Sequence, residues 1–123
     1  RERAFMSEFL PGPVTVVVDR GASLPGNLTA GEPRVGVRIP DDETALALCR
    51  AVGPITATSA NRSGEPSVRQ PADLPASVRE SIGAIVDTGE TPGGGSTVVD
   101  VEAGVIHRRG ALADEIEAWL AGH

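Results

Sequence analysis

Apolar and polar positions along the chain follow two alternating patterns, one typical of buried strands and one typical of amphipathic helices. A nearly unbroken valine run at residues 14–19 predicts a strand buried on both faces. Shorter β-branched runs predict five further strands, the last two joined as a hairpin around 102–104: 34–39, 55–58, 84–87, 96–101 and 105–109. Strands that alternate with helices predict an α/β fold rather than a helical bundle.

Four segments carry the helical pattern. Residues 1–9 end at a Pro-Gly-Pro sequence, and residues 75–82 begin at Pro75. Residues 43–52 follow a capping carboxylate, Asp41 or Asp42, and stop at Gly53. The last helix covers 111–121. The side chains expected to face inward from these last two helices are Ala45, Leu46, Cys49, Val52, Leu112, Ile116, Trp119 and Leu120. Glycine and proline predict loops at 21–33 and 89–95, the second a mobile loop beside a site.

Composition limits the core and the partners of this chain. Its 123 residues suit one domain with a modest core. Aromatic residues make up only 2%, without tyrosine, so we expect a core of Val, Leu, Ile and Ala and no aromatic platform for single-stranded nucleic acid.

Charge excludes further classes of site. All 11 basic residues are arginines, so no lysine of this chain can act as a Schiff base, general base or P-loop cation. The net charge of −6 is opposite to that of a protein held to nucleic acid by its overall field. The single Cys49 cannot form an intrachain disulfide, and His107 and His123 suggest no metal pair. No apolar run is long enough for a membrane span and no signal peptide is visible, so we expect a cytoplasmic location without membrane contact.

Residues 54–67 form the segment richest in candidate chemistry. An apolar entry leads into small hydroxyl and amide side chains, with the sequence PITATSANRSGEPS. Small residues let a ligand approach the backbone, and serine and asparagine offer both donors and acceptors. Because the same residues dominate ordinary turns, this loop alone leaves a turn and a ligand site as open alternatives.

Five ordered segments resemble the YrdC/Sua5 family of threonylcarbamoyl-AMP synthases. Residues 59–67 are similar to the family's serine- and asparagine-rich signature. The other four segments match elements that precede or follow this signature in the same order as in the family: FLPGPVT at 9–15, VGVRIPD at 35–41, GSTVVD at 95–100 and IHRRG at 106–110.

The resemblance implies a twisted mixed β-sheet with flanking helices. Family members carry a Lys-x-Arg element before the PGP segment, and this chain has no counterpart. We therefore expect residues 1–123 to be the C-terminal two-thirds of a YrdC-like domain, incomplete at the N-terminus. This chain alone would then lack part of the nucleotide site.

The resemblance also implies a reaction. L-threonine, bicarbonate and ATP combine into threonylcarbamoyl-AMP with release of pyrophosphate, in the nucleotidyltransferase class, with Mg²⁺ on the ATP phosphates. Downstream transfer proteins then use the adenylate for N6-threonylcarbamoyladenosine in tRNA. All three reactants carry anionic groups, so arginines and N–H donors must offset their repulsion.

Site residues follow from the matched motifs. Ser59 and Asn61 match the pair that acts on the nucleotide and the reacting groups, and their side chains can donate to phosphate or carbamate oxygens. Ser67 and Arg108 match ATP-binding positions, although Arg109 makes the register of the last match uncertain. The threonine-binding positions are Arg38, the backbone at Ala57, and Ser96. The motifs imply no metal-ligating residue.

Three other interpretations remain open at this point. A YrdC-like module that binds RNA or the ribosome would use a local groove lined by arginines. The net negative charge of the chain is unfavourable for this interpretation. A carbamoyl-adenylating domain of the hydrogenase-maturation type is disfavoured because no acylphosphatase-like or zinc-finger segment is present. The chain could also be a fragment that is inactive without its missing half.

Overall fold

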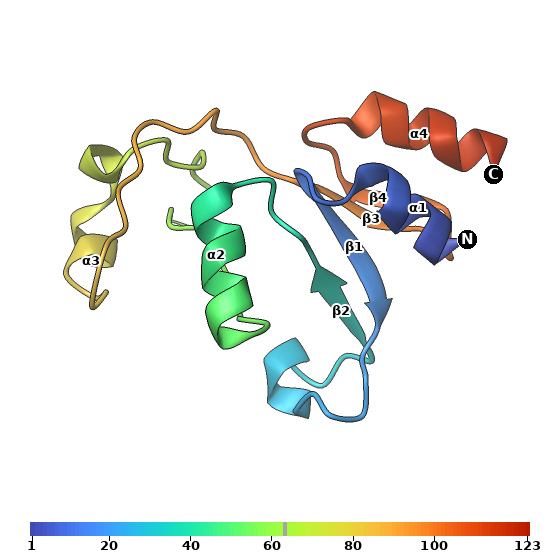
Figure 1. The fold of residues 1–123 in the computed structure, drawn as a ribbon, viewed down its shortest axis with the longest axis horizontal. Helices are drawn as coiled ribbons and strands as arrows, with labels where there is room; N and C mark the ends of the chain where they lie inside the picture. Colours follow the sequence, from blue (N-terminus) through green and yellow to red (C-terminus); the bar gives the residue numbers. More distant parts are fainter. Residues whose placement is uncertain (63) are drawn as a thin grey trace.

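A four-stranded mixed sheet forms the centre of the fold (Figure 1). The computed structural model describes residues 1–62 and 64–123. The strands lie in the order β2-β1-β3-β4, with these bounds: β1 Val14–Asp19, β2 Arg34–Val37, β3 Thr97–Asp100 and β4 Val105–Arg108. Strand β1 pairs antiparallel with β2 and parallel with β3, and β3 pairs antiparallel with β4. The predicted α/β class is confirmed.

Helices lie beside the sheet and form parts of the connections between its strands. The α-helices are α1 Glu2–Phe9, α2 Glu43–Val52, α3 Ala76–Arg79 and α4 Ala113–Gly122, and short 3₁₀ turns lie at η1 Gly26–Thr29 and η2 Pro71–Asp73. In Figure 1, α1 and α4 lie together beside the sheet near both termini, whereas α2 and α3 lie beyond its other side. The described residues contain no helix with the length and apolar character needed to cross a membrane.

The core lies where α1 and α4 pack on one sheet face. Its fully buried residues come from both ends of the chain: Phe5, Val14, Val16, Val99, Val101 and Ile116. The expectation of a purely aliphatic core was wrong, because all three aromatic side chains gather here. The ring of Phe5 lies 4.6 Å from that of Phe9 and 5.2 Å from that of Trp119, edge to face. Trp119 is thus a core anchor, as predicted.

The other face of the sheet carries no helix-covered core. Val17 and Val98 on this face are half-buried, whereas their neighbours Val16 and Val99 are fully buried. The prediction that the valine strand is buried on both faces was therefore wrong. We call this side of the sheet the open face. It is defined by the residues that alternate with the core positions along the strands: Thr15, Val17, Asp19, Arg34, Gly36, Ser96, Val98 and Asp100.

Two predicted strands are not formed. Residues 55–58 and 84–87 belong to no strand of the described sheet, and Ile55 and Val86 are exposed. Their β-branched residues favour extended backbone, yet a strand also needs a neighbour with which to pair. Strand β2 ends at Val37, two residues before the end of the strand predicted at 34–39. Helix α3 is shorter than the helix predicted at 75–82.

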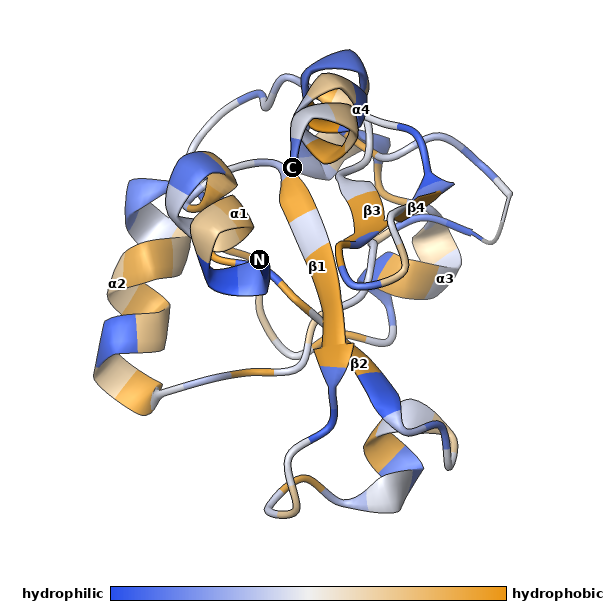
Figure 2. Ribbon diagram, turned by 90° about the vertical axis from the view of Figure 1, so that its right-hand side faces the viewer, coloured by the Kyte–Doolittle hydropathy of each residue, from blue (hydrophilic) through white to orange (hydrophobic). Residues whose placement is uncertain are grey.

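The other helices largely follow the prediction. Asp42 caps α2, because its Oδ2 accepts a hydrogen bond from the Ala45 N–H at 2.8 Å, and Gly53 ends the helix. The α2 face expected to point inward contains no buried residue, and Figure 2 shows hydrophobic positions along this helix as well as along β1. Leu112 was predicted inward but is 39% exposed. It adopts a left-handed backbone conformation, with φ +62°, at the start of α4.

Candidate active site

A hydrogen-bonded cluster on the open face links β1 and β4 through Ser96, the residue that directly precedes β3. The Ser96 Oγ lies 2.8 Å from the Thr15 Oγ1 of β1. The guanidinium of Arg108, at the end of β4, donates from Nη2 to the Ser96 Oγ at 3.1 Å. It also donates from Nε and Nη2 to the Ser96 carbonyl, at 3.1 and 2.9 Å. Two residues predicted from different motifs, one for threonine and one for ATP, are therefore in direct contact.

A register shift directs Arg108 to this face. Val99 pairs with Ile106 and Val98 pairs with Arg108, so the ladder is irregular between Val98 and Val99. Ile106 consequently packs against the core, while Arg108, two residues later, reaches Ser96 on the opposite face. Such irregularities commonly re-aim a side chain.

Gly110 allows the arginine segment to lie against Ser96. A Cβ atom at Gly110 would overlap the Gly95 carbonyl and approach the Ser96 backbone at 2.9 Å. The Gly110 N–H donates to the buried Thr97 Oγ1 at 2.9 Å, and that hydroxyl in turn donates to the Ala111 carbonyl. Glycine two residues after Arg108 is thus a packing requirement of the site.

Arg38 lies next to the open face. It is the first residue after β2, and continued alternation from Arg34 and Gly36 directs it to this side of the sheet. The Gly12 N–H donates to the Ile39 carbonyl at 2.9 Å, so the chain still runs beside the start of β1 here. Arg38 is exposed and makes no ion pair within the described residues.

The loop at 54–67 holds its shape through Asn61. The Nδ2 group of Asn61 donates to the Arg62 and Glu65 carbonyls, each at 2.9 Å. Because both partners are acceptors, the amide nitrogen must face them, and its two protons are engaged within the loop. The Oδ1 atom is buried and has no hydrogen-bond partner among the residues that the structure describes. The side chain of Asn61 therefore has no proton left to donate to a ligand.

The remaining predicted residues of this loop are open to a ligand. Ala57 and Ser59 are exposed, and Ser67 is half-buried. Within residues 1–62 and 64–123, no hydrogen bond links the loop to Ser96 or Arg108. Ser63, inside the serine-rich signature, lies outside the described residues.

Arg34 ties the far end of the open face together. It forms ion pairs with Asp19 at 2.8 Å, Asp100 at 2.9 Å and Glu102 at 3.0 Å. Hydrogen bonds to Asp19 and then to Glu102 raise the pKa of Arg34 above its ordinary value. Because the Arg34 guanidinium already pairs with three carboxylates, we interpret it as a residue that stabilises the sheet and not as a ligand-binding residue.

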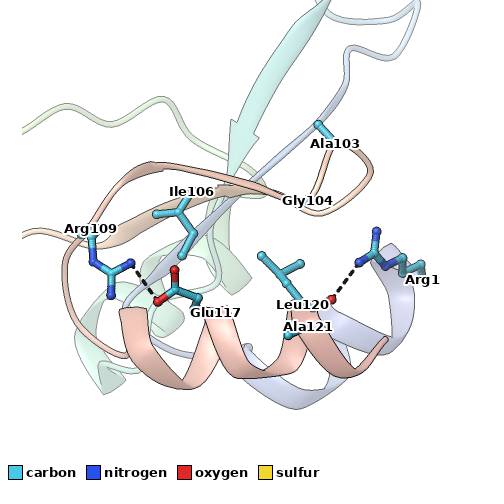
Figure 3. A pocket seen from close by; sticks show the side chains of 8 residues that line it. All are labelled: Arg1, Ala103, Gly104, Ile106, Arg109, Glu117, Leu120 and Ala121. Atoms are coloured by element: carbon cyan, nitrogen blue, oxygen red, sulfur yellow. Dashed lines mark hydrogen bonds and ion pairs between the residues drawn. The ribbon is translucent and has the colours of Figure 1, made fainter.

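One hollow of the described structure lies away from these residues. It has a volume of about 570 Å³ and lies between α4 and the β3–β4 turn (Figure 3). Its charged groups are already paired: Arg109 with Asp114 and Glu117, and Arg1 with the Val101 and Leu120 carbonyls. None of the predicted site residues lines it. A smaller hollow of about 210 Å³ is lined in part by Val68, the residue that directly follows Ser67.

The described residues show no cluster of side chains suited to coordinate a metal ion. No group of three or more His, Cys, Asp or Glu side chains is clustered in the described part of the chain. The ring of His123 stacks on Trp119 at 4.1 Å, and Cys49 is half-buried on α2.

Comparison with known proteins explains why these segments occur together. The family model Sua5_yciO_yrdC, described as telomere recombination, matches residues 1–110. The chain belongs to the Sua5/YrdC family. This confirms the resemblance inferred from the five motifs.

Two curated relatives of this Sua5/YrdC chain are named threonylcarbamoyl-AMP synthase. The Bacillus subtilis protein is 35% identical over 122 residues, covering 98% of this chain and 32% of the relative. The Thiobacillus denitrificans protein is 40% identical over 114 residues, covering 86% of this chain and 57% of the relative. The chain thus spans between about a third and three fifths of the length of these relatives.

A solved structure supports the same assignment. The crystal structure of P. abyssi Sua5 complexed with L-threonine matches with a TM-score of 0.83 and 37% identity. The match covers 95% of this chain and 36% of that one. The sheet order and flanking helices are therefore those of a Sua5 structure.

One residue of the cluster was not predicted. Thr15 lies in the FLPGPVT segment that carried part of the resemblance, but the sequence interpretation gave its hydroxyl no role. The available signal was its place in a buried valine strand, where threonine is the one polar side chain before Asp19.

Proposed function

We propose that the protein carrying this chain forms threonylcarbamoyl-AMP from L-threonine, bicarbonate and ATP, with release of pyrophosphate. The observation that carries the proposal is the contact between Ser96 and Arg108, two motif residues with different expected substrates, in a fold that matches a threonine-bound Sua5. The names of the curated relatives support the same activity over an RNA-binding or carbamoyl-adenylating function.

The open face fits a reaction among anions. Arg38 and Ser96, with the backbone at Ala57, would bind the threonine carboxylate and hydroxyl groups. Arg108, Ser59 and Ser67 would bind the ATP phosphates, where a planar guanidinium suits phosphate oxygens. Catalysis would come from holding the carbamate oxygen in line with the α-phosphorus and from neutralising the charge that develops there.

The proposed role of Asn61 differs from simple anion binding. Because its amide protons bond to the Arg62 and Glu65 carbonyls, it would shape the loop that presents Ser59.

We propose that Mg²⁺ enters as part of the MgATP substrate. The oxygen donors that Mg²⁺ prefers are supplied by the phosphates themselves. The adenylate product would pass to proteins that transfer the threonylcarbamoyl group to tRNA, and a cytoplasmic location would suit this role.

The test is formation of AMP and pyrophosphate by the natural protein. We expect turnover that requires ATP, L-threonine and bicarbonate together. Arg108→Gln should lower kcat/KM about 10- to 100-fold, the range for loss of a charge-assisted contact. Arg109→Gln is the matched control: its guanidinium pairs with Asp114 and Glu117 on the other side of the sheet, so activity should persist.

Two results would overturn the proposal. One is a wild-type protein that shows no AMP formation dependent on L-threonine and bicarbonate. If that protein instead bound RNA with a steep salt dependence, the RNA-binding alternative would replace the synthase. The other is full activity of both Arg108→Gln and Ser96→Ala, because the proposed site would then not be used.

A further inference from the structure

Among the described residues, the Thr15 hydroxyl has one hydrogen-bond partner, the Ser96 hydroxyl. The two oxygens are 2.8 Å apart, although the residues are 81 positions apart in the sequence. Thr15 is half-buried and Ser96 is 8% exposed. A hydroxyl placed on the ligand side of an otherwise valine-rich strand is not needed to hold the core, which lies on the other face.

Counting protons shows what this contact can do. A serine hydroxyl has one proton to donate and two lone pairs that accept. Arg108 has no acceptor, so it must donate to the Ser96 Oγ and it occupies one lone pair. The remaining lone pair and the single proton of Ser96 are left for Thr15 and for a ligand.

A carboxylate ligand settles the direction of the hydrogen bond. A carboxylate only accepts, so Ser96 must give its proton to the ligand. Thr15 must then donate its own proton to Ser96. The hydroxyl of Ser96 is in this way held by two donors, Arg108 and Thr15, with its proton directed at the bound anion.

Gly36 leaves room for the Thr15 methyl group. A Cβ atom at Gly36 would lie 2.9 Å from the Thr15 Cγ2, so the Thr15 methyl group occupies the space that a side chain at position 36 would need. Threonine is branched at Cβ and turns as a unit about χ1. With its methyl directed at β2, its hydroxyl is directed at β3, where Ser96 lies.

We propose that Thr15 is a positioning residue that orients the Ser96 hydroxyl for the carboxylate of L-threonine, and that the absence of a side chain at Gly36 leaves room for the Thr15 rotamer that this requires. This inference rests on the proposed synthase function and assigns a part of its substrate site. Thr15 itself does not touch the substrate. It acts through Ser96.

The first experiment compares KM values for L-threonine and ATP in the natural protein. Thr15→Val keeps the shape of the side chain and removes the hydroxyl. We expect it to raise the KM for L-threonine about five- to tenfold, the effect of one hydrogen bond, with the KM for ATP within twofold of wild type. Thr15→Ser retains the hydroxyl and should restore most of the threonine affinity.

The second experiment asks whether Thr15 acts through Ser96. Thr15→Val in the Ser96→Ala background should add no further loss of threonine affinity, because the hydroxyl that it orients is already absent. Additive losses in this double-mutant cycle would show that Thr15 acts by another route and would overturn the inference.

The third experiment uses the crowding at Gly36. Gly36→Ala should raise the threonine KM in the wild-type background, because the new methyl group displaces Thr15. In the Thr15→Ser background the clash partner is gone, and the same substitution should have little effect. Thr29→Val, which removes a hydroxyl from η1, is the control and should leave both KM values unchanged.

The outcomes separate this inference from the proposed function. If the wild-type protein makes AMP in a threonine-dependent reaction but Thr15→Val retains the wild-type threonine KM, only the positioning role fails. If the wild-type protein neither binds L-threonine in calorimetry nor makes AMP, the proposed function fails and the inference fails with it. Thermal unfolding of each variant shows that a changed KM reflects the site, not the loss of the fold.

Discussion

Arg34 directly precedes the VGVRIPD segment and lies on the open face of the sheet. An arginine groove that binds RNA would include this residue. In the structure it is bonded to three carboxylates and to the Val17 carbonyl, and its side chain is 24% exposed. Arg34 therefore holds β2 against β1 and the end of β3, and its charge is not available to a ligand.

We expect Arg34→Gln to lower the thermal midpoint by a few degrees. The substitution leaves Asp19, Asp100 and Glu102 near one another without a counter-charge, and Asp100 is the least exposed of the three. High salt should narrow the difference between variant and wild type, because it screens the remaining repulsion. Arg50→Gln on α2 is the control, and differential scanning calorimetry in low and high salt is the measurement. A midpoint as high as that of Arg50→Gln would show that the cluster adds no stability.

At the same scale, motif residues were predictable and their partners were not. Ser96 and Arg108 are named by their short sequence patterns, and the structure brings them together. The role of Thr15 depends on a strand pairing that no local pattern contains, and the engaged protons of Asn61 depend on where the Glu65 carbonyl lies. Side-chain chemistry can be listed from the sequence, but the use of each proton requires coordinates.

Among the elements, those bounded by strong local sequence signals were predicted well. Strand β1, helix α1 and helix α2 match the predicted bounds closely, because valine runs, proline stops and a capping aspartate are local signals. The strands predicted at 55–58 and 84–87 are not formed, because no strand of the described sheet pairs with them. Their β-branched residues carry the same local signal, but the sheet ends at β2 on one side and at β4 on the other. Pairing is a property of the sheet and not of the segment.

Helix α2 depends strongly on its own cap. None of its residues is buried, so tertiary packing contributes little to its stability. Asp42→Ala removes the acceptor for the Ala45 N–H and should cost about 1 kcal/mol. We expect amide exchange in α2 to become about fivefold faster, with exchange in β1 and β3 unchanged. Asp41→Ala is the matched control, and equal effects of the two substitutions in hydrogen-exchange mass spectrometry would contradict the capping role.

The whole molecule consists of a packed part and a part without a core. Every described residue from Val17 to Gly95 is exposed or half-buried. The fully buried residues come from the first 16 positions and from Thr97 onward. The candidate site draws on both parts, because Thr15, Ser96 and Arg108 lie in the packed part and the loop at 54–67 lies in the other.

We expect this division to appear in limited proteolysis. Local opening needs little free energy where few apolar contacts are broken, so early cuts should fall within residues 38–95. The pieces that contain β1 and β3 should stay associated after the first cuts, because their contacts form the core. Mass spectrometry of a time course is the measurement, and first cuts in α1 or α4 would contradict this description. The Phe5→Leu variant should shorten the lifetime of the packed part while leaving the first cut sites unchanged.

The parallel pairing of β1 with β3 also determines when the chain can fold. Val14 pairs with Thr97, and the core joins Phe5 near the start to Ile116 near the end. During synthesis β1 must therefore wait until residues 97–100 have left the ribosome before its parallel neighbour β3 exists. Closing so long a loop before any core contact forms makes folding slow. Until then the valines of β1 remain exposed, and binding by a chaperone would protect the nascent chain more than it would a protein with local contacts.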